Sequence, residues 1–277
     1  MDWSQQEVQL IIADYFTMLE LELESVKYSK SEHRVALMQF VKRSKGSIEF
    51  KHQNISAVLH RMGIPFIKGY KPRFNYQREL LESEVAKFLQ LNKARLEKVF
   101  SRFTDQEIIT HPDHQITYED VLDTEPVVSI ANEIEPKYRP IKTNYLEREQ
   151  NNSLLGAEGE KFVLEFEKMR LISQKQAHFI DELRWISRDE GDGTGYDILS
   201  KNENGSDRFI EVKTTKLSKE TPIFLTSNER AFASAKGDDF FLYRVFNFGK
   251  RPKIFIKQGS YEKFCIIQPT QFRGYFQ

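Results

Sequence analysis

Hydrophobic residues in the first hundred positions recur at helical intervals. Ser4 with Glu7, and Ser29 with Glu32, have the spacing of a capping box, in which a serine and a glutamate three residues later satisfy backbone N–H groups at a helix start. We therefore predict four helices, which begin near Ser4 and extend over about 29–41, 54–62 and 76–100. Residues 1–104 are thus expected to form an all-α domain.

From about residue 151 the pattern changes to that of a mixed α/β domain. A long amphipathic stretch predicts a helix over about 155–171, with further helix near 173–177. Runs rich in β-branched and aromatic residues then predict strands over about 183–187, 196–200, 208–215, 240–248 and 253–257. The segment 201–207, Lys-Asn-Glu-Asn-Gly-Ser-Asp, is rich in turn-forming residues and predicts a β-hairpin between the second and third strands.

Residues 105–150 separate these two regions. They are acidic, contain several prolines and lack sustained periodicity, so we predict a connector between domains at 1–104 and 151–277. His111 and His114 lie in this stretch. No second pair of metal ligands accompanies them, and they are interpreted as part of a surface loop.

Composition narrows the class of protein. The 277 residues carry a formal net charge of zero, so affinity for nucleic acid must come from local clusters of charge. The single cysteine, Cys265, excludes a disulfide framework within one chain and a thiolate zinc site. The first residues lack the pattern of a signal peptide, and the apolar stretches are too short to cross a bilayer. We expect a soluble cytoplasmic protein that does not associate with membranes.

Candidate chemistry is concentrated at the predicted hairpin. Because side chains alternate along a strand, Glu211 and Lys213 share one face while Ile210 and Val212 point to the other, and Asp197 reaches the same patch across the hairpin. Two carboxylates suit Mg²⁺, and a nearby lysine can orient a water or stabilise developing negative charge. An ordinary surface ion pair is the alternative interpretation of the same residues.

These residues belong to a longer resemblance. Over about 151–248 the sequence resembles the PD-(D/E)xK nuclease superfamily, and more narrowly the domain named from the C-terminus of the plant protein NO VEIN. The resemblance rests on several pieces in order, at 152–160, 191–198, 210–215, 225–229 and 242–246. It implies a restriction-endonuclease-like fold, a mixed sheet flanked by helices.

The resemblance also implies roles for individual residues. Asp197, Glu211 and the backbone carbonyl of Val212 would bind Mg²⁺, with Mn²⁺ as a substitute. Lys213 would orient or activate the attacking water, and Glu160, on the first helix of the fold, would support the metal or its water. The implied function is a magnesium-dependent DNA endonuclease of restriction or antiviral defence. A non-cleaving nucleic-acid-binding module, a ribonuclease and a regulatory protein that binds a protein partner stay open as alternatives.

The helical region also has a candidate nucleic-acid surface between residues 42 and 74. Its basic side chains are interleaved with aromatic residues, and Asn54 is a candidate reader of base edges. The basic members are Lys42, Arg43, Lys45, Lys51, Arg61, Lys68, Lys71 and Arg73. The plainer alternative is a solvated basic face. This region resembles, more loosely, helical regions that precede bacterial restriction-type nuclease domains.

Two weaker signals lie near the hairpin. Thr226 and Glu229 have capping-box spacing, so Glu229 is interpreted as a helix cap in preference to a catalytic residue. The glycine-rich segment 191–195 precedes a strand, and it is interpreted as a loop that flanks the active site. One active site cuts one strand, so double-strand cleavage of DNA requires a homodimer or two successive binding events, and we predict the homodimer as the commoner solution. An additional protein subunit stays open.

Overall fold

The computed structural model describes residues 3–106, 117–126 and 139–271. The chain divides into two compact units, each treated by itself below. Unit 1 comprises the described parts of 1–110, 126–155 and 215–223, and unit 2 those of 111–125, 156–214 and 224–277. The arrangement of a helical unit and an α/β unit agrees with the prediction, although the chain passes between the two units several times.

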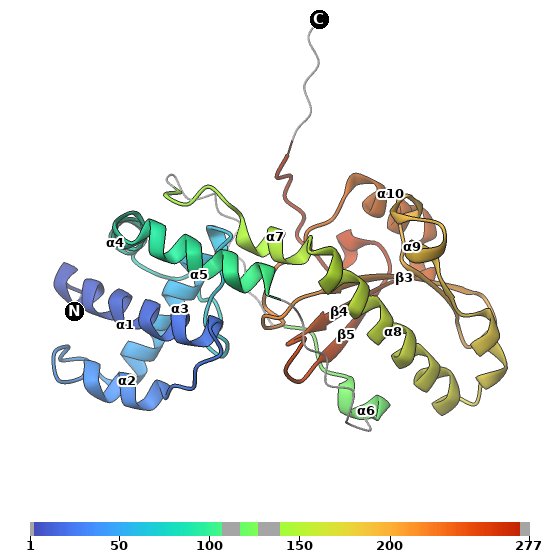
Figure 1. Ribbon diagram of the computed structural model, residues 1–277, viewed down its shortest axis with the longest axis horizontal. Coiled ribbons are helices and arrows are strands. Elements are labelled where there is room, and N and C mark those ends of the chain that lie inside the picture. The colour runs from blue at the N-terminus through green and yellow to red at the C-terminus, as the bar shows by residue number, and fades with distance from the viewer. Residues whose placement is uncertain (1–2, 107–116, 127–138, 272–277) are drawn as a thin grey trace, which may run out of the picture. The chain divides into compact units, whose positions relative to one another are not determined.

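Unit 1 is built from helices, and α1 packs against most of the others (Figure 1). Its helices are α1 (Gln5–Leu23), α2 (Lys30–Leu37), α3 (Lys45–Arg61), α4 (Arg78–Leu91), α5 (Lys93–Asp105) and α7 (Tyr145–Gln150). Both predicted capping residues, Ser4 and Ser29, accept a hydrogen bond from the backbone three residues later. No helix within the described ranges is both long and apolar enough to cross a membrane.

Three helix boundaries differ from the prediction. Helix α2 ends at Leu37 instead of about 41, and α3 begins at Lys45 because Ser44 supplies its N-cap. The helix expected over 76–100 is two helices, broken at Asn92, whose side-chain Nδ2 donates to the carbonyl of Phe88 at 2.9 Å. Asparagine competes for backbone hydrogen bonds in this way, and it is therefore common where one helix ends.

The predicted connector contains folded segments among its described residues, 105–106, 117–126 and 139–150. Ile141 and Tyr145 belong to the hydrophobic core of unit 1, at 1% and 2% exposure. The short helix α6 (Tyr118–Val121) belongs to unit 2, where the next residue, Leu122, bridges to Ile254. A few apolar residues are enough to anchor these short segments but too few to show a period in the sequence. His111 and His114 lie outside the described residues.

Unit 2 has a five-stranded sheet in the order β1-β2-β3-β4-β5, in which only the β3–β4 pair is parallel. The strands are β1 (Arg184–Trp185), β2 (Ile198–Lys201), β3 (Asp207–Thr214), β4 (Phe240–Phe246) and β5 (Lys253–Gln258). The predicted hairpin is confirmed, with Ile198 opposite Ile210. The remaining elements are α8 (Ser153–Ser173), η1 (Ala177–Glu182), α9 (Ile186–Asp189), η2 (Asp192–Thr194), α10 (Ser227–Lys236), η3 (Gly237–Asp239) and η4 (Tyr261–Lys263).

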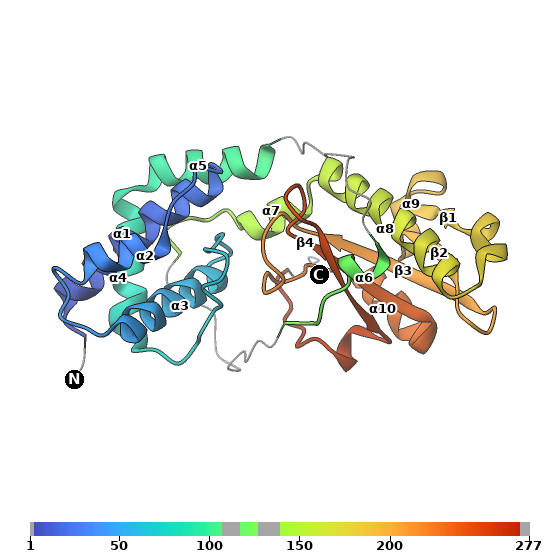
Figure 2. The same ribbon diagram turned by 90° about the horizontal axis from the view of Figure 1, so that it is seen from below.

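Helices α8 and α10 cover opposite faces of this sheet, as seen from below in Figure 2. On one face Gly159 of α8 meets Thr214 of β3 so closely that a Cβ at position 159 would lie 1.8 Å from the threonine Oγ1. On the other face Phe232 of α10 packs edge-on against Phe209 of β3. The alternation of side chains along β3 therefore turns residues 209, 211 and 213 toward α10.

A buried ion network fixes α8 to the sheet. Glu167 and Arg170, at 0% and 3% exposure, form a two-point ion pair on α8 with N–O distances of 2.8 and 2.7 Å. The hydroxyl of Tyr243 on β4 donates to the same glutamate at 2.5 Å. Because removing either charge would leave the other buried and unpaired, this network holds the helix in one register on the sheet.

Candidate active site

Asp197, Glu211 and Lys213 come together at one end of the β2–β3 hairpin, on the face covered by α10. The Nζ of Lys213 lies 2.7 Å from Glu211 Oε1. Asp197 precedes β2 directly, and its Oδ2 accepts a hydrogen bond from the backbone N–H of Val212 at 2.8 Å. Glu211 and Lys213 are only 3% and 8% exposed, so the ion pair is buried and differs from an ordinary surface pair.

The glycine-rich loop positions Asp197 by packing on α10. Gly195 has a φ of +89°, and a Cβ there would lie 2.7 Å from the Cβ of Phe232. The side chain of Asn228, at the start of α10, donates to the carbonyl of Gly193 at 2.9 Å. A residue other than glycine at position 195 would therefore be strained and would displace the loop that leads into Asp197.

Glu160 reaches the site from α8. Its Oε2 accepts hydrogen bonds from the indole Nε1 of Trp185, at 2.5 Å, and from the hydroxyl of Ser187. The charge of Glu160 contributes to raising the pKa of both Asp197 and Glu211, so the three carboxylates are close enough to interact. Trp185 and Ser187 were not anticipated as site residues, because their sequence carries no signal beyond a short predicted strand.

Burial and mutual repulsion perturb the acids. Burial raises the pKa of Asp197 well above its usual value, and the charges of Glu211 and Glu160 raise it further. Burial also raises the pKa of Glu211 to about 7, although Lys213 opposes the change. Burial lowers the pKa of Lys213, but the carboxylates of Glu211 and Glu229 outweigh it and the net pKa is raised. The site thus holds several carboxylates against one ammonium and favours an added cation.

Glu229 has two roles in the structure. The predicted capping box is present, with the backbone N–H of Thr226 donating to Glu229 Oε2 at 3.1 Å. The same Oε2 lies 2.9 Å from Lys213 Nζ, so Glu229 also forms one side of the lysine's ion pair. The interpretation as a cap was right but incomplete, because the contact with Lys213 depends on how α10 packs on the sheet.

A buried tyrosine borders the same acids. The side chain of Tyr261, in η4, is fully buried, and its hydroxyl has no hydrogen-bond partner among the described residues. Burial raises its pKa, and the charges of Glu211, Glu229 and Asp197 add to the effect. Its position beside the acids was not predicted from the sequence.

No group of three or more His, Cys, Asp or Glu side chains in the described part of the chain is arranged to hold a metal ion by itself. Any metal at the hairpin would have to share its coordination between a few carboxylates, water and substrate.

The basic residues predicted to bind nucleic acid lie in unit 1, where their environments differ. Lys51 is 4% exposed, with its ammonium 4.8 Å from the ring centroid of Trp3. Asn54 is 1% exposed and donates to the backbone carbonyl of Arg73 at 2.8 Å. These two side chains are structural and do not fit a role on the surface. They were selected for residue type alone, and the pattern of α3 places them inward.

Other members of the set have protein partners or lie exposed. Arg43 pairs with Glu7 at 2.8 Å, and Arg61 pairs with Glu82 at 3.3 Å. Two aromatic residues of the same predicted surface, Phe66 and Tyr70, are each 4% exposed and belong to the core of unit 1. The exposed members are Lys42, Lys45, Lys68, Lys71 and Arg73.

Residues 159–257 match the family model described as Protein NO VEIN, C-terminal. The match contains Glu160, Asp197, Glu211 and Lys213, and it runs from α8 to β5, somewhat further toward the C-terminus than predicted. No curated protein and no solved structure matches the chain. This part of unit 2 is therefore similar to that family's domain.

Proposed function

We propose that unit 2 is a metal-dependent nuclease of the PD-(D/E)xK superfamily, with a restriction-endonuclease-like fold, that hydrolyses phosphodiester bonds in DNA. The observation that carries the proposal is the buried meeting of Asp197, Glu211 and Lys213 at the end of the hairpin, with Glu160 nearby. A buried group of like charges is costly, and such groups are concentrated at functional sites. The family match over the same residues supports this assignment.

The donor set fits Mg²⁺, with Mn²⁺ as a substitute. Mg²⁺ usually takes one or two protein carboxylates and completes its shell with water and substrate phosphates, so a closed protein site is not needed. Asp197 and Glu211 lie opposite each other across the hairpin, and the charge of Glu211 raises the pKa of Asp197, an effect that a divalent cation would relieve. The N–H of Val212 points to Asp197. The carbonyl of Val212 lies on the same edge of β3 as its N–H, because the N–H and C=O groups of one residue in a strand point the same way.

When bound, the metal would neutralise charge on the scissile phosphate and make a coordinated water more acidic. Lys213 carries a full positive charge in a fixed position, since Glu211 and Glu229 hold its ammonium from two sides. An ammonium held in this way can orient the attacking water or stabilise negative charge that develops on the phosphate oxygens. Glu160, fixed by Ser187 and Trp185, would accept a hydrogen bond from a water at the same centre.

We also propose an oligomeric state and a biological role. A single active site cuts one strand at a time, so we propose that double-strand cleavage uses a homodimer. The role proposed is restriction of foreign DNA in the cytoplasm, with recognition assigned to the helical unit 1, alone or with an additional protein subunit. The exposed members of the predicted surface are Lys42, Lys45, Lys68, Lys71 and Arg73, and we propose that this surface contacts phosphates.

The test is cleavage of supercoiled plasmid, phage DNA with modified bases, and RNA, each with Mg²⁺ and with EDTA. Lys213→Ala should abolish cleavage. Glu229→Gln should lower the rate and keep the helix start, because glutamine can still close a capping box. Lys161→Ala is the matched control, since Lys161 is an exposed lysine next to Glu160. Circular dichroism of each variant separates loss of chemistry from loss of folding.

Cleavage that requires Mg²⁺ and disappears with Lys213→Ala, but not with Lys161→Ala, would establish the activity and its centre. Cleavage of RNA alone would make the protein a ribonuclease. Binding without any cleavage would leave the non-cleaving nucleic-acid module. Activity that survives Lys213→Ala in a folded protein would overturn the catalytic assignment.

A further inference from the structure

An exposed apolar segment in unit 1 runs from the last turn of α2 into the turn that follows it. Val35, Met38 and Phe40 are 60%, 43% and 71% exposed, although large hydrophobic side chains are normally buried. Phe40 lies in the turn after α2, where its backbone N–H donates to the carbonyl of Leu37 at 3.0 Å. The aromatic ring is thus presented to solvent on a hydrogen-bonded turn, and its exposure does not come from a loose chain end. Such clusters of exposed apolar residues mark interaction sites.

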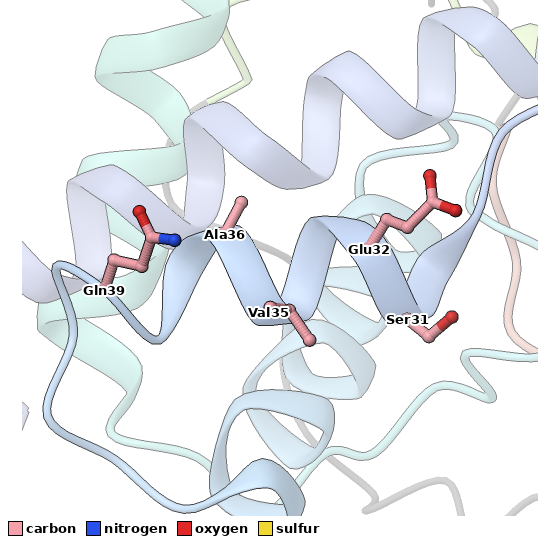
Figure 3. Close-up of a pocket in the computed structure, with 5 residues that line it drawn as sticks. All are labelled: Ser31, Glu32, Val35, Ala36 and Gln39. Carbon is pink, nitrogen blue, oxygen red and sulfur yellow. The ribbon is translucent and has the colours of Figure 1, made fainter.

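The outer face of α2 continues this surface. A shallow depression of about 320 Å³ is lined by Ser31, Glu32, Val35, Ala36 and Gln39. Figure 3 shows Val35 on α2 and Gln39 beyond the C-terminal end of that helix, in the turn that also contains Phe40. Apolar contact area and an amide that can donate and accept hydrogen bonds are therefore available beside Phe40.

Two exposed basic residues lie close to Phe40 in the chain. Lys42 and Lys45 are exposed and follow the ring closely in the chain. Helix α3 begins at Lys45 with no acidic residue in its first turn, so the positive end of its dipole is not offset locally. Gly46 leaves open space, since a Cβ there would meet no atom within 4 Å. These features complement a negatively charged partner and not an apolar protein surface.

We propose that the segment 35–46 binds nucleic acid that has unpaired bases, with Phe40 stacking on a base while Lys42 and Lys45 contact phosphates. Aromatic stacking combined with nearby cations is the general mode of binding to single strands. In an intact duplex the base faces are already stacked on one another, so an exposed ring gains most at single strands, ends or extruded bases. The proposal rests on the proposed function for its choice of nucleic acid, and it names the substrate feature that unit 1 recognises.

The experiment is fluorescence anisotropy with a labelled single-stranded oligodeoxynucleotide and its duplex, in EDTA so that nothing is cleaved. Phe40→Ala should weaken binding to the single strand by about 5- to 150-fold, the range that loss of one stacked base produces. Replacing both Lys42 and Lys45 by alanine should lower the slope of log affinity against log salt by about 1.4, two phosphate contacts at roughly 0.7 each. Binding to the duplex should be weaker and should change less with Phe40→Ala.

Three further variants serve as controls. Leu91→Ala and Lys98→Ala are matched controls, because Leu91 is 86% exposed and Lys98 is exposed on α5, outside the segment. Both should leave affinity unchanged. Phe40→Leu separates stacking from apolar contact, since leucine keeps an apolar side chain but has no ring. It should bind as weakly as Phe40→Ala.

Equal affinity for Phe40→Ala and Leu91→Ala would overturn the proposal. So would full binding by Phe40→Leu, or self-association of the wild type that Phe40→Ala abolishes while oligonucleotide binding persists. The outcome is independent of catalysis. Lys213→Ala protein should bind like the wild type, so a failed nuclease assay with Phe40-dependent binding would remove the proposed function and keep this inference.

Discussion

Glu211 should make the metal-free protein less stable as the pH rises, and Glu211→Gln should remove that loss. The pKa of Glu211 is raised from 4.5 to about 7 on folding, chiefly by burial. The folded state therefore binds the proton more tightly than the unfolded state. Below pH 4.5, the pKa of Glu211 in the unfolded chain, the group costs no stability. The free energy of unfolding then falls as the pH rises to about 7, which is the reverse of the behaviour of a salt-bridged carboxylate. Glutamine mimics the protonated form, so it is free of this effect.

The magnitude follows from the same values. Each unit of pKa corresponds to about 1.4 kcal/mol, so the full cost above both values is about 3 kcal/mol. At about pH 5 most of that cost is absent, because the folded carboxyl is still protonated. The difference in free energy of unfolding, Glu211→Gln minus wild type, should therefore be about 2 kcal/mol larger at pH 8 than at pH 5. Glu211 is 3% exposed, so solvent screening does not reduce the figure greatly.

The assay is denaturant unfolding in EDTA, followed by tryptophan fluorescence. The chain has two tryptophans, Trp3 in unit 1 and Trp185 in unit 2. A Trp3→Phe background leaves Trp185, which contacts Glu160, as the reporter of unit 2 alone. Parallel pH profiles for the wild type and Glu211→Gln would refute the reasoning, since they would mean that folding does not change the affinity of Glu211 for its proton.

Three further predictions concern the surroundings of the site. Gly159→Ala should destabilise unit 2 by about 1–3 kcal/mol in denaturant melts, because its Cβ would overlap Thr214; an unchanged midpoint would show that α8 can move away freely. Ser187→Ala should slow cleavage without changing the melting temperature, because Glu160 loses a donor at the partly exposed edge of the site; a large drop in melting temperature would instead assign Ser187 a role in folding. Tyr261→Phe should raise stability by about 1 kcal/mol, because the hydroxyl is buried without a partner; destabilisation would mean that the hydroxyl has a partner in solution.

Local signals predicted much of the secondary structure. Capping serines located the starts of α1 and α2, and turn-forming residues located the β2–β3 hairpin, because each depends on neighbours only a few positions apart. The hairpin in turn brought Asp197 opposite Glu211 and put Glu211 and Lys213 on one face, since strand alternation is a fixed property of the backbone. The convergence of these three side chains could therefore be derived from spacing, whereas their roles were inferred from the family resemblance.

Long-range packing was not predictable in the same way. Glu229 was recognised only as a cap, and Tyr261 was not considered, because each reaches the acids through helices that fold back onto the sheet. Lys51 and Asn54 were assigned to a surface on the basis of residue type, whereas tertiary contacts bury both. The residues after 138 looked like a connector, because a few buried residues such as Ile141 and Tyr145 show no periodicity in the sequence.

The double role of Glu229 links the fold to the proposed chemistry. Its Oε2 accepts both the backbone N–H of Thr226, at the start of α10, and the ammonium of Lys213. The register of α10 on the sheet therefore sets the position of the lysine, and Phe232 on the same helix packs against Gly195 in the loop before Asp197. One helix thus fixes the cation and, through the loop, one of the acids. A change that shifts α10 would move the two together, so we expect its effect on the site to exceed what its own contacts suggest.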